Sequence, residues 1–472
     1  MRQGYVGDLI GLDGHNRSGN DGIWFVYDRL TAYDDQLTPT PMLAESWDIS
    51  PDARQYSFHL RKGVQFHSGR ELTSDDVKYN IQRTADPKNG GGQLAPLANW
   101  WTAIDTPDKY TVVVSSDLSR PNAFDYFEYL NIIDKETQEG PDSKTKVVGT
   151  GPWTFVEWIQ GDHVSLVKNQ NYWQSGRPYL DGITIPILRD QQAMVAELEA
   201  GALDVARGPS LRDFTRLRDD PNFGGLADTA TGGFYVIGAN TSRPPTDNKM
   251  VRQALNYAFD RQRFVDTVLL GVGKAESIPW PMASAAYEAS KVSTYTFDLD
   301  KAQSLLNQAG AGPFEIDILL YLATAEYQGM AQLYQADLAK LGVTLNIKTQ
   351  DVGTWLDQVN NAKYLGLYSG PASLGDLAPA TCFTSSKAFA PASNNSAFKS
   401  DRYAELITQT ATEPDPAKAK PLYSALNDLF LDESFTMVLS PALPTLLTKK
   451  GVHGVTYTHH EMVTYTNAWL DA

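Results

Sequence analysis

Two segments far apart in the chain show the order strand, helix, strand in their apolar and polar residues. In each, a strand-like run is followed by a helical pattern that ends at a glycine, and then by a second strand-like run. These runs are residues 182–188, 190–201 and 203–205 in the first segment, and 314–320, 334–342 and 343–347 in the second. Crossovers of this kind join parallel strands in right-handed units. The pattern therefore predicts two α/β lobes.

The sequence also marks where single elements begin. A helix is predicted from Asp247 or Asn248, either of which can cap it, because the apolar residues that follow form one stripe. That stripe consists of Val251, Ala254, Leu255, Ala258 and Phe259. Nearer the N-terminus, residues 56–60 alternate as a half-buried strand, and residues 73–76 (TSDD) predict a capped helix start with acids in its first turn.

Composition narrows the class of protein. The 472 residues suggest about three domains, and 42 % hydrophobic with 20 % charged residues is ordinary for a globular protein. The net charge of -16 argues against nucleic-acid partners and against docking on anionic membranes, since both need a basic surface. The single cysteine, Cys382, excludes an intrachain disulfide and a cysteine-based metal cluster.

The chain has no apolar run long enough to span a bilayer, which takes about 18 residues. Its start, MRQGYVGDLIGLDGH, also lacks the basic region and apolar stretch of a signal peptide. We expect that an export signal precedes this start and has been removed.

Residues 42–84 read MLAESWDISPDARQYSFHLRKGVQFHSGRELTSDDVKYNIQRT. This resembles the signature of extracellular solute-binding protein family 5, the oligopeptide, dipeptide and nickel binders of ABC importers. About a dozen fixed positions recur in order. Further blocks that resemble the family are VGTGPW (148–153), LVKNQNYW (166–173), NTSRPPTDNKMVRQALNYAFDR (240–261), FDLDKAQSLLNQAG (297–310) and YQADLAKLGVTLNI (334–347).

The resemblance implies an α/β fold, the bilobed periplasmic-binding-protein clamp (type II, cluster C) with an extra domain inserted in lobe one. Carried over, lobe one comprises residues 1–32, 147–240 and 440–472, the extra domain residues 33–146, and lobe two residues 241–439. The implied protein is a monomer without a cofactor and not an enzyme. It captures a small solute, a peptide or a sugar- or amino-acid-conjugate, between two lobes by hinge closure. It delivers the solute to an inner-membrane ABC permease, in the periplasm or, lipid-anchored, outside the cell.

Candidate ligand residues in lobe one and the extra domain are Asp8, Trp24, Asn99, Trp100 and Trp101. Asp8 begins a loop (GLDGH) that resembles a ligand-flanking loop of the family, although Gly14 stands where proline is usual; alternatively, Asp13 and His15 only brace this loop. Trp24 either faces the ligand or belongs to an apolar helix stripe with Tyr27 and Leu30. Adjacent tryptophans on one element cannot both face the ligand.

The candidates in lobe two are Asn256, Trp355, Tyr368, Ser369, Gly370, Ser373 and Asp376. Trp355 follows a predicted strand, a place that often faces ligand. In peptide-binding relatives the region around 364–383 carries an acidic, proline-containing loop whose Asp pairs with the terminal ammonium of the peptide. Asp376 and Pro379 match that loop only loosely, which leaves a sugar-like or amino-acid conjugate open. Small residues here either cradle such a ligand with backbone groups or form a plain turn.

Other kinds of site find little support. His459 and His460 are neighbours that on a strand point to opposite faces, and no HExxH spacing occurs, so we expect no metal site. A hydrolase remains the alternative class, although the nucleophile elbow G-x-S-x-G is missing. A receptor or chaperone using the same clamp is the other alternative.

Overall fold

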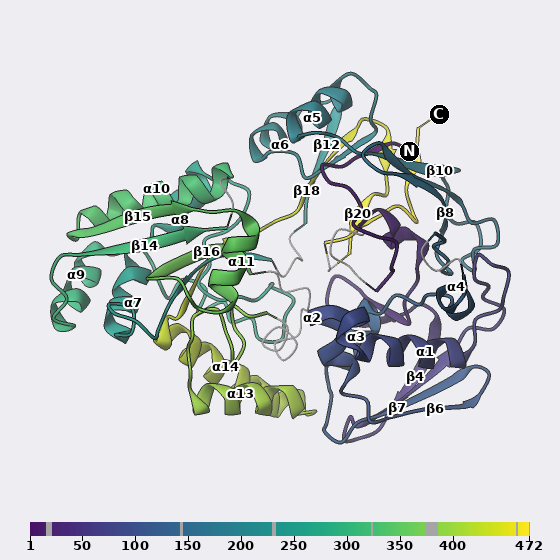
Figure 1. The fold of residues 1–472 in the computed structure, drawn as a ribbon, viewed down its shortest axis with the longest axis horizontal. Helices are drawn as coiled ribbons and strands as arrows, with labels where there is room; N and C mark the ends of the chain where they lie inside the picture. Colours follow the sequence, from purple (N-terminus) through teal and green to yellow (C-terminus); the bar gives the residue numbers. More distant parts are fainter. Residues whose placement is uncertain are drawn as a thin grey trace. The chain divides into compact units, whose positions relative to one another are not determined.

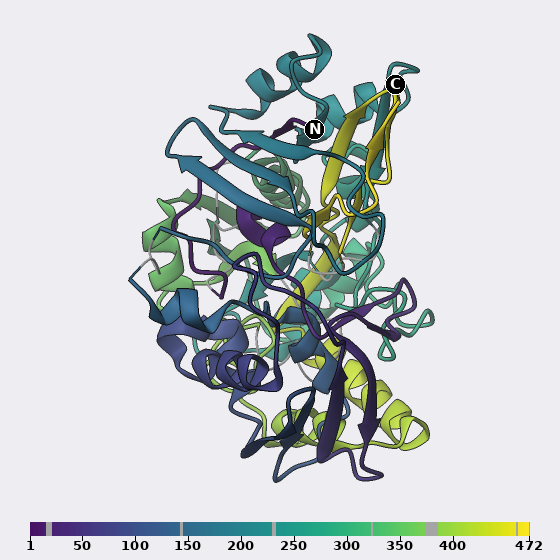
Figure 2. The ribbon, with the colours of Figure 1, turned by 90° about the vertical axis from the view of Figure 1, so that its right-hand side faces the viewer.

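The computed structural model describes residues 1–15, 21–141, 145–228, 233–321, 324–372, 386–458 and 461–471. The chain divides into two compact units. Unit 1 comprises residues 1–228 and 444–472, and unit 2 comprises residues 229–443 (Figure 1). Both ends of the chain lie on unit 1 (Figure 2). Among the described residues, no helix is both long and apolar enough to cross a membrane.

Unit 2 is built on a five-stranded sheet in the order β15-β14-β16-β13-β17. Its strands are β13 (Phe234–Ala239), β14 (Phe314–Leu320), β15 (Val343–Thr349), β16 (Leu367–Ala372) and β17 (Thr436–Pro441). Its helices are α7 (Lys249–Tyr257), α8 (Arg261–Thr267), α9 (Leu299–Gln308), α10 (Ala325–Ala339), α11 (Val352–Asn360), α13 (Asp401–Thr412) and α14 (Pro416–Glu433). β14 is parallel to β15 and to β16, whereas β13 is antiparallel to β16 and β17. Strands β14 to β17 therefore end at one edge, the carboxyl edge of this sheet.

Two predictions from the pattern are confirmed in unit 2. β14, α10 and β15 form the predicted crossover, with Phe314 opposite Val343 in a parallel ladder. α7 begins after Asn248, whose side chain accepts a hydrogen bond from the backbone N–H of Met250 at 2.9 Å. β13 was assigned to lobe one, but it pairs on both sides with strands of unit 2.

Unit 1 contains several smaller sheets, in the orders β1-β11-β18-β12, β10-β9-β8 and β4-β5-β7-β6, together with three pairs of strands. Its strands are β1 (Gln3–Gly4), β2 (Thr31–Tyr33), β3 (Pro39–Pro41), β4 (Ala44–Ile49), β5 (Gln55–Leu60), β6 (Ala103–Asp108), β7 (Thr111–Ser115), β8 (Trp153–Ile159), β9 (His163–Lys168), β10 (Gly182–Pro186), β11 (Val205–Arg207), β12 (Phe223–Ala227), β18 (Thr445–Lys449), β19 (Val452–His453), β20 (Thr456–Tyr457), β21 (Val463–Thr464) and β22 (Trp469–Leu470). Its helices are a 3-10 helix (Asp21–Val26), α1 (Ser74–Ala85), α2 (Pro87–Ala98), α3 (Ala123–Tyr129), α4 (Lys135–Glu139), α5 (Gln191–Glu199) and α6 (Leu211–Leu217).

The predicted crossover in this unit differs in one respect. β10, α5 and β11 are present, but β10 and β11 are not neighbours. The first residues of the chain run between them. β1 pairs with β11, while Arg2 forms a parallel bridge to Thr184 of β10 and Tyr5 forms one to Ile187, which directly follows β10. A crossover that skips one strand position keeps both strands parallel and leaves room for a third.

Residues 33–146 have a sheet and a hydrophobic core of their own within unit 1. The sheet β4-β5-β7-β6 is antiparallel, and side chains of β5 alternate between buried and less buried as the sequence predicts. α1 begins at the predicted place, where Asp76 accepts hydrogen bonds from the N–H and hydroxyl of Thr73 at 2.9 and 3.0 Å. The separation of these residues as a third domain stays a prediction.

Candidate functional site

Three aromatic rings meet at the carboxyl edge of the unit 2 sheet. Tyr321 directly follows β14, Trp355 lies on α11, and Tyr368 lies on β16. Trp355 is edge-on to both tyrosines, with ring centroids 4.9 Å from Tyr321 and 6.1 Å from Tyr368. In open α/β sheets, ligands bind outside the carboxyl ends of the strands. This aromatic cluster therefore occupies the place in unit 2 where that rule puts a ligand.

Local sequence holds Trp355 in this position. Asp351 caps α11 by accepting the N–H and hydroxyl of Thr354 at 2.9 and 2.6 Å, so the helix starts one turn before the tryptophan. The indole N–H donates to the carbonyl oxygen of Leu319 at 3.4 Å, and the side chain is 4 % exposed. Gly370 lies under the ring, because a Cβ at that position would be 2.7 Å from the Cζ2 atom of Trp355. The predicted Gly370 thus serves close packing between strand and ring.

The structure places Ser369 and Asn256 away from the aromatic cluster. Ser369 points to the opposite face of β16, where its hydroxyl is 3.5 Å from the sulfur of Met330 on α10. Tyr368 is fully buried, and burial raises its pKa to about 12, so its phenol is neutral. Asn256 lies on α7, where it accepts a hydrogen bond from Arg261 and donates to Ser434 at 3.3 Å. Ser373 and Asp376 lie outside the described residues.

In unit 1, the side chains of the N-terminal loop are occupied by contacts within the protein. Asp8 accepts hydrogen bonds from the indole N–H of Trp158 and the backbone N–H of Gly161, both at 2.7 Å. The carboxylate of Asp13 accepts a hydrogen bond from each terminal nitrogen of Arg83, at 3.0 and 2.6 Å. The bracing role considered for Asp13 and His15 agrees with these contacts.

His15 is buried between two polar partners. Its Nε2 is 3.0 Å from the carbonyl oxygen of Asn131, and its Nδ1 is 2.7 Å from Arg83. Because Nε2 faces an acceptor and Nδ1 faces an obligate donor, the neutral tautomer with its proton on Nε2 satisfies both. Burial, and then the positive charge of Arg83, lower the pKa of His15 to about 4.

The aromatic candidates of unit 1 lie in two different places. Trp24 is on the 3-10 helix rather than on the predicted α-helix stripe, and it is 5 % exposed. Trp101 is 7 % exposed and packs in the core around β5, whereas Trp100 is half-buried beneath the Arg120 guanidinium, 4.8 Å above its ring. Asn99 caps the end of α2, and its amide donates to the carbonyl oxygens of Ala85 and Ala95.

Sequence reasoning missed two residues near the carboxyl edge. Tyr321 is the first residue after a predicted strand, and that position was the available signal. Glu276 carried no signal, because it is one acid in an irregular segment. Its N–H donates to the carbonyl oxygen of Leu439 on β17 at 3.2 Å, and its side chain is 6 % exposed. Burial raises the pKa of Glu276 to about 7, against the opposing effect of Lys274.

A second feature of unit 2 is a groove of about 640 Å³ beside α11, lined by parts of β14, β15 and the segment before β16. Charges of both signs line it: Lys363 pairs with Asp357 at 2.9 Å, and Lys348 and Asp317 are close by. The groove is more polar than the aromatic cluster.

Among the described residues, no group of three or more His, Cys, Asp or Glu side chains is arranged to hold a metal ion. His459 and His460 are outside that description.

Comparison with known proteins identifies the family. The family model described as "Bacterial extracellular solute-binding proteins, family 5 Middle" matches residues 38–381. The chain belongs to this family. This binding protein is 33 % identical over 376 residues to heme-binding protein A of Haemophilus influenzae, covering 73 % of this chain and 68 % of the relative. It is 26 % identical over 467 residues to the dipeptide-binding protein of Escherichia coli, covering 91 % and 86 %.

Solved structures agree on the fold. The Brucella suis NikA protein, crystallised in complex with Fe(III)-EDTA, superposes on this binding protein with a TM-score of 0.89 at 21 % identity, covering 100 % of both chains. The binding protein therefore has the bilobed α/β fold of periplasmic binding proteins, as the sequence predicted. It is a solute-binding protein of an ABC importer, which hands a small solute to a membrane permease.

Proposed function

We propose that the binding protein captures a small peptide, or an amino-acid or sugar conjugate, at the carboxyl edge of the unit 2 sheet. The observation that carries this proposal is the aromatic cluster of Tyr321, Trp355 and Tyr368. Aromatic walls with a few placed polar groups are typical of small-molecule sites. Two relatives, named as a dipeptide-binding and a heme-binding protein, support a solute with apolar and amide or carboxyl groups.

The rings of the cluster differ in how exposed they are, and we assign them different roles. Trp355 is nearly inaccessible and forms the back wall, whereas Tyr321 is half-buried and offers a face to solvent. We assign the direct contact to Tyr321, because the Trp355 indole already covers Gly370. Ser373 and Asp376 lie outside the described residues and stay predictions. We leave the other candidates out of the direct contact, because their side chains contact other parts of the protein; these candidates are Asp8, Trp24, Asn99, Trp100, Trp101, Asn256 and Ser369.

The first experiment identifies the solute. Native mass spectrometry of the purified full chain, compared with denatured protein, gives the mass of any molecule retained from the cell, and calorimetry then gives its affinity. Tyr321→Ala is expected to weaken binding about tenfold or more, because ring contacts contribute about 1 to 3 kcal/mol. Tyr321→Phe keeps the ring and is expected to bind within about threefold of the natural protein.

A matched control is Tyr179→Ala, since Tyr179 is an exposed tyrosine of unit 1 with 49 % of its surface accessible. Its binding should equal that of the natural protein. Equal binding by Tyr321→Ala would place the solute elsewhere and refute the assignment to the carboxyl edge. We further propose that capture is the whole activity, in the periplasm or at the cell surface. Recovery of the solute chemically unchanged after prolonged incubation supports this, and a cleaved product would favour a hydrolase.

A further inference from the structure

Glu276 of unit 2 is a buried acid without a partner. It is 6 % exposed, and within the described part of the chain no group donates a hydrogen bond to its carboxylate or forms an ion pair with it. The buried aspartates of the described residues all accept at least one hydrogen bond; they are Asp28, Asp76, Asp125, Asp134, Asp204 and Asp337. A buried polar group that lacks a partner within the protein calls for an explanation. One explanation is a partner that the protein itself does not supply.

The position of Glu276 relates it to the solute site. Its N–H donates to the carbonyl oxygen of Leu439 near the end of β17, so this part of the chain runs along the carboxyl edge of the sheet. Ile278, two residues further on, belongs to the same hydrophobic core as Trp355 and Tyr368. Glu276 therefore lies at the edge proposed to hold the solute, beside the core that carries the aromatic cluster.

The electrostatic surroundings of Glu276 leave its charge uncompensated. Burial raises the pKa of its carboxyl group to about 7, and the exposed Lys274 opposes this only in part. Burial, and then the negative charge of Glu276, raise the pKa of the half-buried Tyr287, so that phenol lies near the carboxylate. A cation placed beside the carboxylate would favour its ionised form, and an aromatic ring nearby adds to the attraction for that cation.

We propose that Glu276 selects solutes that carry a cationic group, an ammonium or a guanidinium, and that its carboxylate receives this group. The inference rests on the proposed capture of the solute at the carboxyl edge, and it narrows the class of that solute. Asp376 stays the predicted partner of the terminal ammonium of a peptide, so Glu276 receives a second cation, such as the side chain of lysine or arginine. Hydrogen bonds between such a cation and a carboxylate are among the strongest in proteins.

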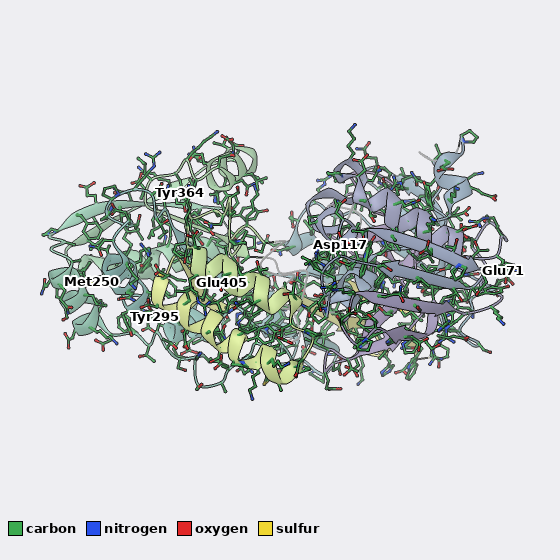
Figure 3. The ribbon with its side chains drawn as sticks, turned by 90° about the horizontal axis from the view of Figure 1, so that it is seen from below. Glu71, Asp117, Met250, Tyr295, Tyr364 and Glu405 are labelled. Carbon is green, nitrogen blue, oxygen red and sulfur yellow. The ribbon has the colours of Figure 1, made fainter. Side chains whose placement is uncertain are left out.

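The test is calorimetry of the full chain with two dipeptide probes, alanyl-lysine and alanyl-norleucine. The probes share their backbone and their alkyl side chain, but norleucine lacks the ammonium group. The natural protein is expected to bind alanyl-lysine about tenfold or more tightly than alanyl-norleucine, since a hydrogen bond to a charged group contributes about that much. Glu276→Gln should bind both probes about equally. The control Glu405→Gln changes an acid on α13 whose side chain is 55 % exposed, and it should keep the preference (Figure 3).

A pH series separates direct contact from a structural role. The carboxylate must be ionised to hold the cation, so the preference of the natural protein for alanyl-lysine should rise roughly tenfold from pH 6 to pH 8. The terminal groups of the two probes titrate alike, so they cancel in this comparison. In Glu276→Gln the preference should not change with pH.

The possible results separate this inference from the proposed function. Equal binding of the two probes by the natural protein overturns the inference but leaves capture of the solute intact, and so does a folded Glu276→Gln variant that keeps the preference. If neither dipeptide binds, the inference falls together with the capture of peptides at this edge. Because the two probes are compared on the natural protein, the test stands even if Glu276→Gln does not fold.

Discussion

His15 offers a quantitative test of how the N-terminal loop is held. Its imidazole is 2 % exposed and lies between the carbonyl oxygen of Asn131 and the guanidinium of Arg83. The variant His15→Gln keeps a side-chain N–H donor that can face the carbonyl oxygen but removes the titrating ring. Comparing the stability of this variant with that of the natural protein at two pH values isolates the effect of protonating His15, because the other titrating groups are common to both.

The magnitude follows from the pKa of the folded state, about 4, against the ordinary value of 6.5. A histidine with a lowered folded pKa contributes stability that is fully present above 6.5 and is lost as the pH falls toward 4. The full difference corresponds to about 3 kcal/mol at about 1.4 kcal/mol per pH unit. Between pH 7.5 and pH 5 the natural protein should lose about 2 kcal/mol relative to His15→Gln.

Urea unfolding of both proteins at these two pH values measures the effect. A control with the opposite sign is His163→Gln, because the carboxylate of Asp162, 2.7 Å from the ring, raises the pKa of His163. That histidine contributes stability at low pH which is lost as the pH rises through its folded pKa. If the difference between the natural protein and His15→Gln stays constant from pH 7.5 to 5, a neutral buried imidazole is refuted.

Three further predictions concern unit 2, each read out as the free energy of unfolding in urea. Trp355→Ala should destabilise the protein by about 3 to 5 kcal/mol through loss of a buried ring. The control Trp469→Ala, at a residue 43 % exposed, should cost less than about 1 kcal/mol. Equal costs for the two variants would contradict the burial of Trp355 in the core of unit 2. Gly370→Ala should cost about 1 to 3 kcal/mol because its Cβ collides with the indole, and an unchanged stability would show that the ring does not contact the strand. Glu276→Gln should gain about 1 to 2 kcal/mol relative to the natural protein as the pH rises from 4.5 to 7. The raised pKa of Glu276 gives the natural protein stability that is fully present below pH 4.5 and is lost as the pH rises through about 7. If the variant instead gained stability relative to the natural protein as the pH fell, the carboxylate would be paired.

The sequence predicted those parts of the fold that local periodicity controls. The crossover from β14 to β15 was predictable because its strands are adjacent in space and its helix ends at Gly342. The separation of β10 from β11 was not, because the strand between them comes from residues near position 3, about 200 residues away in the sequence. Periodicity within a window carries no information about such pairings.

The candidate site was predictable to a similar extent. Trp355 was a candidate because it follows a predicted strand, and the same rule applied to β14 would have made Tyr321 a candidate as well. Whether a residue at such an edge faces solvent depends on its neighbours. Ser369 and Gly370 are consecutive on β16, yet only Gly370 faces the indole, because side chains alternate across a strand. The roles of Asp8 and Asn99 depended on partners that no motif specifies.

The order of pairing in unit 1 has a consequence for how the chain is completed during synthesis. β18 lies between β11 and β12 and is hydrogen-bonded to both, but it follows the whole of unit 2 in the sequence. Until Thr445–Lys449 leave the ribosome, β11 and β12 face each other across an empty strand position with unpaired backbone groups. Open edges of this kind recruit other strands and promote aggregation. A chain whose synthesis halts within unit 2 would therefore expose the facing edges of β11 and β12, although most residues of unit 1 had already been made.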